Sequence, residues 1–110
     1  MSDLANRRCA PCEGTAALDR DAARKLLAQL SGWSIDADAK RIQRTFDFTN
    51  FYETMAFVNA VAWVAHREDH HPDLEVGYKR CVVLYSTHAV GGLSENDFIC
   101  AAKIDALAAK

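Results

Sequence analysis

Apolar residues recur at helical spacing in the segment from Leu18 to Leu30. They fall at positions 18, 22, 23, 26, 27 and 30, with charged residues between them. This is the stripe of a helix that buries one face. Asp19 can cap the first turn, and Ser31 and Gly32 can end the helix. We therefore predict a first helix over residues 18–30.

Strict alternation follows the first helix. Ile42, Phe46 and Phe48 alternate with polar residues after a short apolar segment at 33–35, and alternation is the period of a half-buried strand. The polar stretch 36–40 lies between the two segments. We predict a β-hairpin that turns there.

The next segment predicts a longer, more deeply buried helix. Asn50 followed by Glu53 is a variant of the capping box, and the helix that it opens extends to about His66 or His70. Its circumference is mostly apolar, which indicates burial on more than one side. In a chain this small, we expect one of those sides to meet another subunit. The two apolar faces are Phe51, Met55, Val58, Ala62 and Ala65, and Phe57, Val61 and Val64.

A second hairpin and a last helix complete the pattern. Pro72 ends the helical region, and residues 74–78 and 81–87 predict two strands. Ser94 can cap a last helix with Asp97 at its third position. The order α-β-β-α-β-β-α predicts an α+β fold, in which three helices pack on one face of a four-stranded antiparallel sheet.

Length and charge narrow the function classes. The chain has 110 residues, enough for one domain. We expect an N-terminal arm over residues 1–17 and the domain over 18–110. The longest apolar stretch, Met55–Ala65, is too short to span a bilayer, and no secretion signal begins the chain. The 13 basic and 15 acidic residues are not clustered, so we expect a cytoplasmic protein that binds neither nucleic acid nor membrane.

Four cysteines are present: Cys9, Cys12, Cys81 and Cys100. Without a secretion signal, we expect them to stay reduced. Cys9 and Cys12 have the CxxC spacing of a redox or zinc half-site, but no second close pair follows and no strand precedes them. We therefore favour a mobile arm with two thiols over a metal or redox function, and a core position for Cys81 and Cys100.

All four histidines, His66, His70, His71 and His88, lie within residues 66–88. Imidazoles suit acid–base catalysis at neutral pH. His66 and His70 also have a spacing that can hold zinc on a helix, but Arg67 stands where a zinc protease has its catalytic Glu. A third interpretation is that they are polar surface residues around a helix end.

The spacing of these histidines resembles the signature of the pterin-4a-carbinolamine dehydratases. The resemblance covers about residues 18–108, and the CxxC arm is similar to that of bacterial members. Short sequence segments near these residues match the family as well, including residues 57–59, 86–88 and 91–94. The residues that carry the signature are His66, His70, His71, Pro72, Tyr78, His88 and Asp97.

The resemblance implies the same sheet and helices as the pattern above. It implies the removal of water from a 4a-hydroxytetrahydropterin to give the quinonoid dihydropterin, without metal or organic cofactor. That reaction regenerates the tetrahydrobiopterin-type cofactor of aromatic amino-acid hydroxylases, chiefly phenylalanine hydroxylase. It also implies a homodimer or homotetramer.

The resemblance assigns roles residue by residue. His70 and His88 are the proton-transfer pair, and His71, the third histidine of the catalytic set, mainly holds the pterin. Asp97 completes the set by orienting its neighbours, and its other expected role is to complete the cap at Ser94. His66 stands at a substrate-contacting position that is commonly a carboxylate.

Two other functions remain open from the sequence. The first is a catalytically weak protein-binding module on the same fold, acting in assembly or as a coactivator. Such a module would have no reason to keep His70, His71 and His88 together. The second is a small zinc protein that uses His66 and His70.

Overall fold

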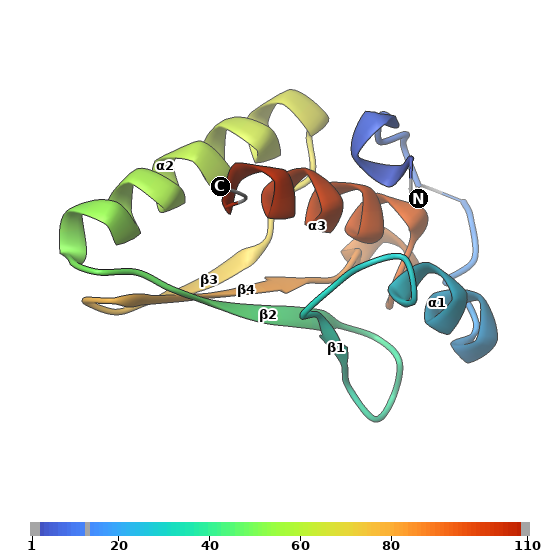
Figure 1. Ribbon diagram of the computed structural model, residues 1–110. Helices are drawn as coiled ribbons and strands as arrows, with labels where there is room; N and C mark the ends of the chain where they lie inside the picture. The colour runs from blue at the N-terminus through green and yellow to red at the C-terminus, as the bar shows by residue number, and fades with distance from the viewer. Residues whose placement is uncertain (1–2, 13, 109–110) are drawn as a thin grey trace.

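Two β-hairpins join side by side into one antiparallel sheet (Figure 1). The computed structural model describes residues 3–12 and 14–108. The first hairpin consists of β1 (Ser34–Ile35) and β2 (Ile42–Asp47), and the second of β3 (Asp73–Val76) and β4 (Arg80–Tyr85). Their order in the sheet is β1-β2-β4-β3, so the second strands of both hairpins lie at the centre and the first strands form the edges.

Helices cover one face of this sheet. They are α1 (Arg20–Leu27), α2 (Phe51–Glu68) and α3 (Glu95–Ala108), and short 3₁₀ helices, η1 (Leu4–Asn6) and η2 (His88–Val90), lie near the ends of the longer elements. In Figure 1, α2 and α3 lie side by side over the sheet. The predicted fold class and element order are confirmed.

The core lies between the sheet and α2 and α3. β4 is central in the sheet, and its residues Cys81, Val83 and Tyr85 alternate toward the helices as the period of a strand requires. The first turn of α3 is also almost wholly buried. The buried cluster comprises Leu4, Ala23, Trp33, Ile42, Phe46, Phe57, Val61, Cys81, Val83, Tyr85, Leu93, Phe98, Ile99, Cys100, Ala101 and Ile104.

The start of α2 follows the capping prediction with one change of partner. The Asn50 side chain accepts a hydrogen bond from the backbone N–H of Glu53 at 2.9 Å. The Glu53 carboxylate reaches back to the N–H of Thr49, one residue before the cap, at 3.0 Å. The helix ends at Glu68, and the next residue, Asp69, has a left-handed φ of 52° that turns the chain toward β3.

The N-terminal segment lies against the domain that it precedes. Leu4 is fully buried in the core, and Lys103 of α3 donates a hydrogen bond to the carbonyl of Ala5 at 2.8 Å. The sequence predicts a mobile arm over residues 1–17; in the structure, described residues of this segment contact α3 and the end of α2. The periodicity of the chain does not reveal these contacts, because the apolar ones come from two isolated residues, Leu4 and Cys9.

Several boundaries differ from the sequence prediction. The last strand is predicted over residues 81–87, but β4 ends at Tyr85 and His88 opens η2. The chain turns sharply here, since the N–H of Thr87 donates to the carbonyl of Gly92 and Gly91 has a left-handed φ of 69°. The first helix begins at Arg20, directly after the predicted cap Asp19, whose carboxylate accepts a hydrogen bond from the N–H of Ala22 at 2.8 Å, and it ends at Leu27 rather than at residue 30.

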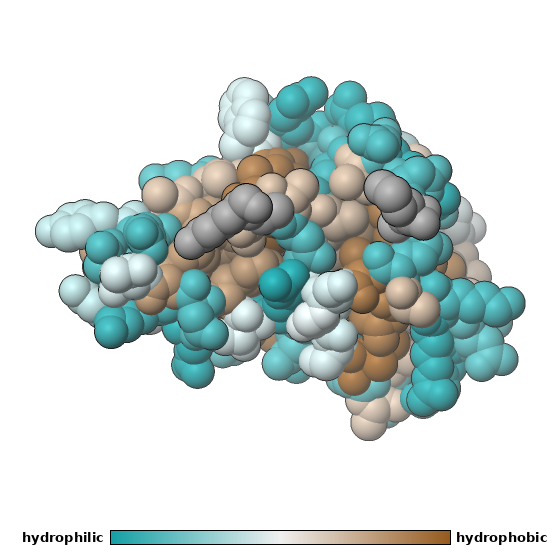
Figure 2. Space-filling model, viewed as in Figure 1, coloured by the Kyte–Doolittle hydropathy of each residue, from teal (hydrophilic) through white to brown (hydrophobic). Residues whose placement is uncertain are grey.

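Several large apolar side chains remain exposed. In Figure 2, apolar residues gather over α2 and α3 and again in a band beside α1, with polar residues around both. Within residues 3–12 and 14–108, no helix has the length and apolar character needed to cross a bilayer. The exposed large apolar residues are Phe51, Tyr52, Trp63, Val76, Tyr78 and Leu107.

The cap of α2 gives a testable prediction. Replacing Asn50 with Ala leaves the backbone N–H of Glu53 without its partner, so we expect Asn50→Ala to lower the free energy of unfolding by about 1 kcal/mol in chemical denaturation. The matched control is Asn59→Ala at an exposed position of the same helix, for which we expect a change within about 0.5 kcal/mol. Equal losses in the two variants would contradict the capping role.

Candidate active site

A cavity of about 580 Å³ opens where three segments that are distant in the sequence meet. The N-terminal arm contributes residues 8–12, the end of α2 and its following loop contribute residues 67–71, and the loop after β4 contributes residues 86–89. Asn96, at the start of α3, completes the wall. Its volume is that of a site for a small organic ligand.

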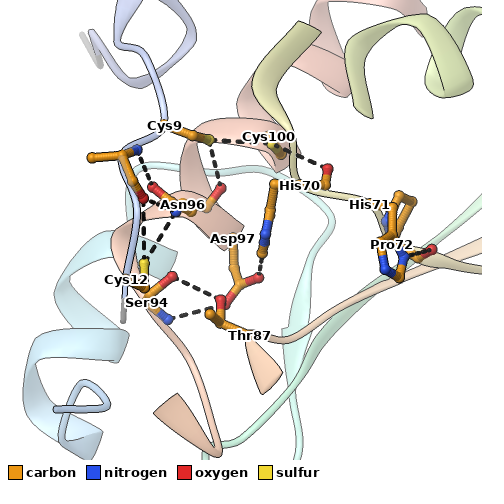
Figure 3. A network of polar contacts seen from close by, with 11 residues as sticks. Cys9, Cys12, His70, His71, Pro72, Thr87, Ser94, Asn96, Asp97 and Cys100 are labelled. Carbon is orange, nitrogen blue, oxygen red and sulfur yellow. Dashed lines mark hydrogen bonds and ion pairs between the residues drawn. The ribbon is translucent and has the colours of Figure 1, made fainter. Parts of the chain in front are cut away.

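His70 and Asp97 form the central contact of this site (Figure 3). The Nε2 atom of His70 lies 2.6 Å from Oδ1 of Asp97. Because a carboxylate only accepts hydrogen bonds, Nε2 carries the donated proton, and Nδ1 is the ring nitrogen that can exchange a proton with a ligand. The His70 side chain is 12% exposed and that of Asp97 is fully buried.

Asp97 serves the helix and the site together. Its Oδ2 atom accepts hydrogen bonds from the backbone N–H of Ser94 at 3.0 Å and from the hydroxyl of Thr87 at 2.8 Å. The bond from Ser94 is the capping contact expected at the start of α3. Both roles that the sequence left open for Asp97 are therefore present, because each oxygen of the carboxylate meets different partners.

The ring of His70 stacks on that of Tyr85. The two ring centres lie 5.3 Å apart, with an angle of 14° between the planes. Burial alone would lower the pKa of His70, but the hydrogen bond and the negative charge of Asp97 outweigh it. The pKa of His70 therefore lies above its usual value, with smaller contributions from Cys100 and Asp69.

The other predicted histidines take different positions. His71 and His88 both line the cavity and are exposed to it, and a ring nitrogen of His71 lies 3.2 Å from the carbonyl of Pro72. His66 is not among the lining residues, and its ring lies beside Trp63 at 5.5 Å. The structure thus brings together His70, His71, His88 and Asp97, and leaves His66 outside the cavity.

Sequence reasoning missed a second buried carboxylate, Glu68. It accepts a hydrogen bond from the backbone N–H of Cys9 at 2.8 Å and forms an ion pair with Arg8 at 3.0 Å. Burial by itself would raise the pKa of Glu68, but Cys9, Lys103 and Arg8 together outweigh burial and lower it. Glu68 therefore holds the arm against the end of α2.

Asn96 was also missed, and it fixes the next residue of the arm. Its amide donates to the carbonyl of Ala10 at 2.7 Å and accepts from the N–H of Ala10 at 3.0 Å. Nothing in local spacing relates residues 10 and 96. The one signal was the resemblance of the CxxC arm to bacterial members of the family, and the sequence analysis drew no role for the arm from it.

No group of three or more metal-ligating side chains is present in the described parts of the chain, residues 3–12 and 14–108. The Nε2 atom of His70 is bonded to Asp97, whereas the ring of His66 lies beside Trp63. The two histidines that a zinc site would share therefore contact different partners.

The amino-acid sequence of this chain matches a known protein family. Residues 16–107 match the family model described as pterin 4 alpha carbinolamine dehydratase. A protein of Nitrosomonas eutropha is 64% identical over 97% of this chain and 95% of its own length. One of Legionella pneumophila is 57% identical over 96% of both chains. Both are provisionally named pterin-4-alpha-carbinolamine dehydratases.

Solved structures share the fold. The crystal structure of a transcriptional coactivator/pterin dehydratase from Brucella melitensis has a TM-score of 0.80 and 31% identity, covering 84% of this chain and 99% of its own. A pterin dehydratase-like protein, identified as a RuBisCO assembly factor in the alpha-carboxysome, has a TM-score of 0.62 and 22% identity. It covers 72% of this chain and 92% of its own, and at that identity it supports the fold alone.

The contact between His70 and Asp97 predicts a change in titration. We expect Asp97→Asn to lower the pKa of His70, because the variant removes the charge that favours the imidazolium. NMR titration of the His70 ring measures the shift. Asp69→Asn, which removes a smaller and exposed contribution, is the matched control and should lower the pKa less. An unmoved His70 titration in Asp97→Asn would contradict the assignment.

The same contact predicts a pH dependence of stability. Since the pKa of His70 is raised in the folded state, its stabilisation is fully present below the unfolded pKa of about 6.5 and is lost as pH rises through the folded value. We expect the difference in unfolding free energy between the wild type and Asp97→Asn to be largest near the acidic end of a range from about pH 5 to 9. A difference that grows with pH would contradict this sign.

Proposed function

Because the chain belongs to the pterin-4a-carbinolamine dehydratase family, we propose that it removes water from a 4a-hydroxytetrahydropterin to give the quinonoid dihydropterin. The observation that carries the proposal is one cavity lined by His70, His71 and His88, with Asp97 bonded to the first of them. Membership of the family by itself accounts for the fold and does not require the activity. The cavity adds three histidines, a residue type that can transfer protons at neutral pH.

The reaction needs two proton transfers. The bond between carbon 4a and its hydroxyl oxygen breaks, and the oxygen leaves as water after receiving a proton. The proton on N5 is removed, and the electron pair of the N5–H bond forms the double bond between N5 and carbon 4a. An acid and a base on the same cavity can perform both transfers, each contributing roughly 10²- to 10⁴-fold.

His70 is suited to the acid role. Its raised pKa keeps more of the imidazolium at neutral pH than a free histidine would have. Asp97 holds Nε2, so that Nδ1 is the atom that delivers the proton, and Asp97 is therefore a positioning residue. His88, exposed on η2, is assigned the base role, and His71 holds the pterin.

His66 is left out of the proposed set. The family signature gives this position a role in substrate contact, but in this chain the ring lies beside Trp63 and the residue does not line the cavity. The family commonly has an acidic residue at this position. In this chain the carboxylates that raise the pKa of His70 are those of Asp97 and Asp69, so an acidic residue at position 66 is not needed for that effect.

The proposed reaction belongs to cofactor recycling in the cytoplasm. Its substrate is the product of an aromatic amino-acid hydroxylase, chiefly phenylalanine hydroxylase, which hydroxylates the pterin cofactor as it oxidises the amino acid.

We also propose a homodimer or homotetramer. Phe57 and Val61 of α2 are buried within the chain, whereas Phe51 and Trp63 of the same helix remain exposed.

The decisive test follows dehydration of a chemically generated 4a-hydroxytetrahydropterin, with the spontaneous rate subtracted. We expect the wild type to accelerate the loss of water, and His70→Ala and His88→Ala each to reduce kcat by about 10²-fold or more. His66→Ala separates the two interpretations of that residue, and we expect its kcat and KM to stay within about twofold of the wild type.

Two outcomes would overturn these assignments. A wild type that matches the spontaneous rate while remaining folded by circular dichroism would refute the dehydratase proposal, and a protein-binding role on this fold would replace it. A rise in KM for His66→Ala at unchanged kcat would restore the substrate contact that the family signature implies for that residue.

A further inference from the structure

Two thiols that are 91 positions apart in the sequence meet beside the cavity. The Sγ atom of Cys9 lies 3.5 Å from that of Cys100, as Figure 3 shows. Cys9 belongs to the N-terminal arm and lines the cavity, whereas Cys100 is fully buried in α3. Both are free cysteines, and neither has a role in the dehydration proposed above.

Contacts on both sides of Cys9 hold the N-terminal arm in place, and they fix the position of Cys9 relative to Cys100. The ion pair between Arg8 and Glu68 and the hydrogen bond from the N–H of Cys9 to the same carboxylate fix the backbone before the sulfur. The paired hydrogen bonds between Ala10 and Asn96 fix it on the other side. Contacts on both sides of Cys9 therefore direct its side chain toward α3.

Cys12 has no such partner, although the CxxC spacing pairs it with Cys9 in the sequence. Its Sγ atom accepts a hydrogen bond from the amide of Asn96 at 3.1 Å and lies 3.5 Å from the carbonyl of Ala10. Among the described residues, the one thiol–thiol contact is that between Cys9 and Cys100. The tertiary structure thus sets Cys9 against a cysteine outside its own CxxC motif.

The chemistry of the pair suits a two-thiol reaction. The hydrogen bond from Cys9 lowers the pKa of Cys100 against the opposing effect of burial, and the positive charge of His70 adds to the lowering. The same hydrogen bond and burial raise the pKa of Cys9. The pair therefore places a thiol that lines the cavity in contact with a second sulfur buried behind it.

We propose that Cys9 and Cys100 form a disulfide bond when hydrogen peroxide enters the cavity, and that this bond fastens the N-terminal arm to α3 as a wall of the site. The sulfur of Cys9 attacks one peroxide oxygen and gives up its proton, the O–O bond breaks, and the departing oxygen takes up a proton and leaves as water, so that Cys9 becomes a sulfenic acid. The sulfur of Cys100 then attacks the sulfur of that sulfenic acid, and the hydroxyl leaves with the Cys100 proton as a second water. The two thiols lose two electrons, and the peroxide gains them.

The bond requires a small movement. A disulfide needs about 2.05 Å between its sulfurs, so the two atoms must approach each other by about 1.5 Å. Cys9 lies outside the helices and strands, so the arm can supply this shift while α3 stays in place. Once closed, the bond prevents residues 8–12 from leaving the cavity.

Peptide mapping tests which cysteines are joined. The full chain is treated with a slight molar excess of hydrogen peroxide, its remaining thiols are alkylated, and it is digested with trypsin without reductant. We expect the peptide Cys9–Arg20 to be linked to Cys81–Lys103, and tandem mass spectrometry to place the bond between Cys9 and Cys100. The link should survive in Cys12→Ser and disappear in Cys9→Ser and Cys100→Ser.

Other products would overturn the proposal. A disulfide bond between Cys9 and Cys12 would show that oxidation joins the two cysteines of the CxxC motif instead. A disulfide bond to Cys81 would show that the local structure had opened. Full alkylation of all four cysteines would show that no disulfide bond forms. None of these readouts uses the dehydration reaction, so this proposal and the proposed function fail independently.

Hydrogen exchange tests whether the bond fastens the arm. The amides of Cys9 and Ala10 are bonded to Glu68 and Asn96, so they exchange when the arm opens. We expect oxidation to slow their exchange by about tenfold or more, since opening must then break the cross-link or deform α3. Dithiothreitol should reverse the effect, and Cys100→Ser should not show it. Unchanged exchange in the cross-linked protein would contradict the fastening.

Discussion

The buried carboxylate of Asp97 is the constraint on which the site depends. A carboxylate without partners is costly to bury, and this one is fully buried yet hydrogen-bonded to His70, Thr87 and Ser94. It also lies in the first turn of α3, where the helix dipole favours negative charge. These partners come from the loop after α2, the loop after β4 and the start of α3. One charge therefore joins the segments that carry His70, His71 and His88.

A second buried carboxylate, Glu68, does the same for the arm. Its side chain is 5% exposed and is satisfied by Arg8, the backbone N–H of Cys9 and Lys103. Removing the arm would leave this carboxylate with fewer partners, so the arm and the end of α2 depend on each other. The cavity thus has one wall that belongs to the folded domain and one that is added by residues 8–12.

Much of the fold could be predicted from local patterns, because the period of apolar residues reflects which face of an element is buried. The stripe after Asp19, the alternation from Ile42 and the cap at Asn50 all correspond to observed elements. The predicted strand over residues 81–87 extended two residues past the end of β4 at Tyr85, because Ser86 and Thr87 follow the apolar run without a turn signal, whereas the hydrogen bond from the N–H of Thr87 to the carbonyl of Gly92 turns the chain there. Patterns of side chains do not record such backbone contacts.

The sequence by itself determined the element order, the fold class and the family, because each rests on residues that are near one another in the chain or at set spacings within a motif. Only the tertiary structure decided which of these residues meet. It joined His70 to Asp97, left His66 beside Trp63 and placed Cys9 against Cys100 rather than Cys12. The physical reason is that hydrogen bonds and sulfur contacts depend on distances of a few ångströms between segments far apart in the sequence, which packing sets and local spacing does not contain.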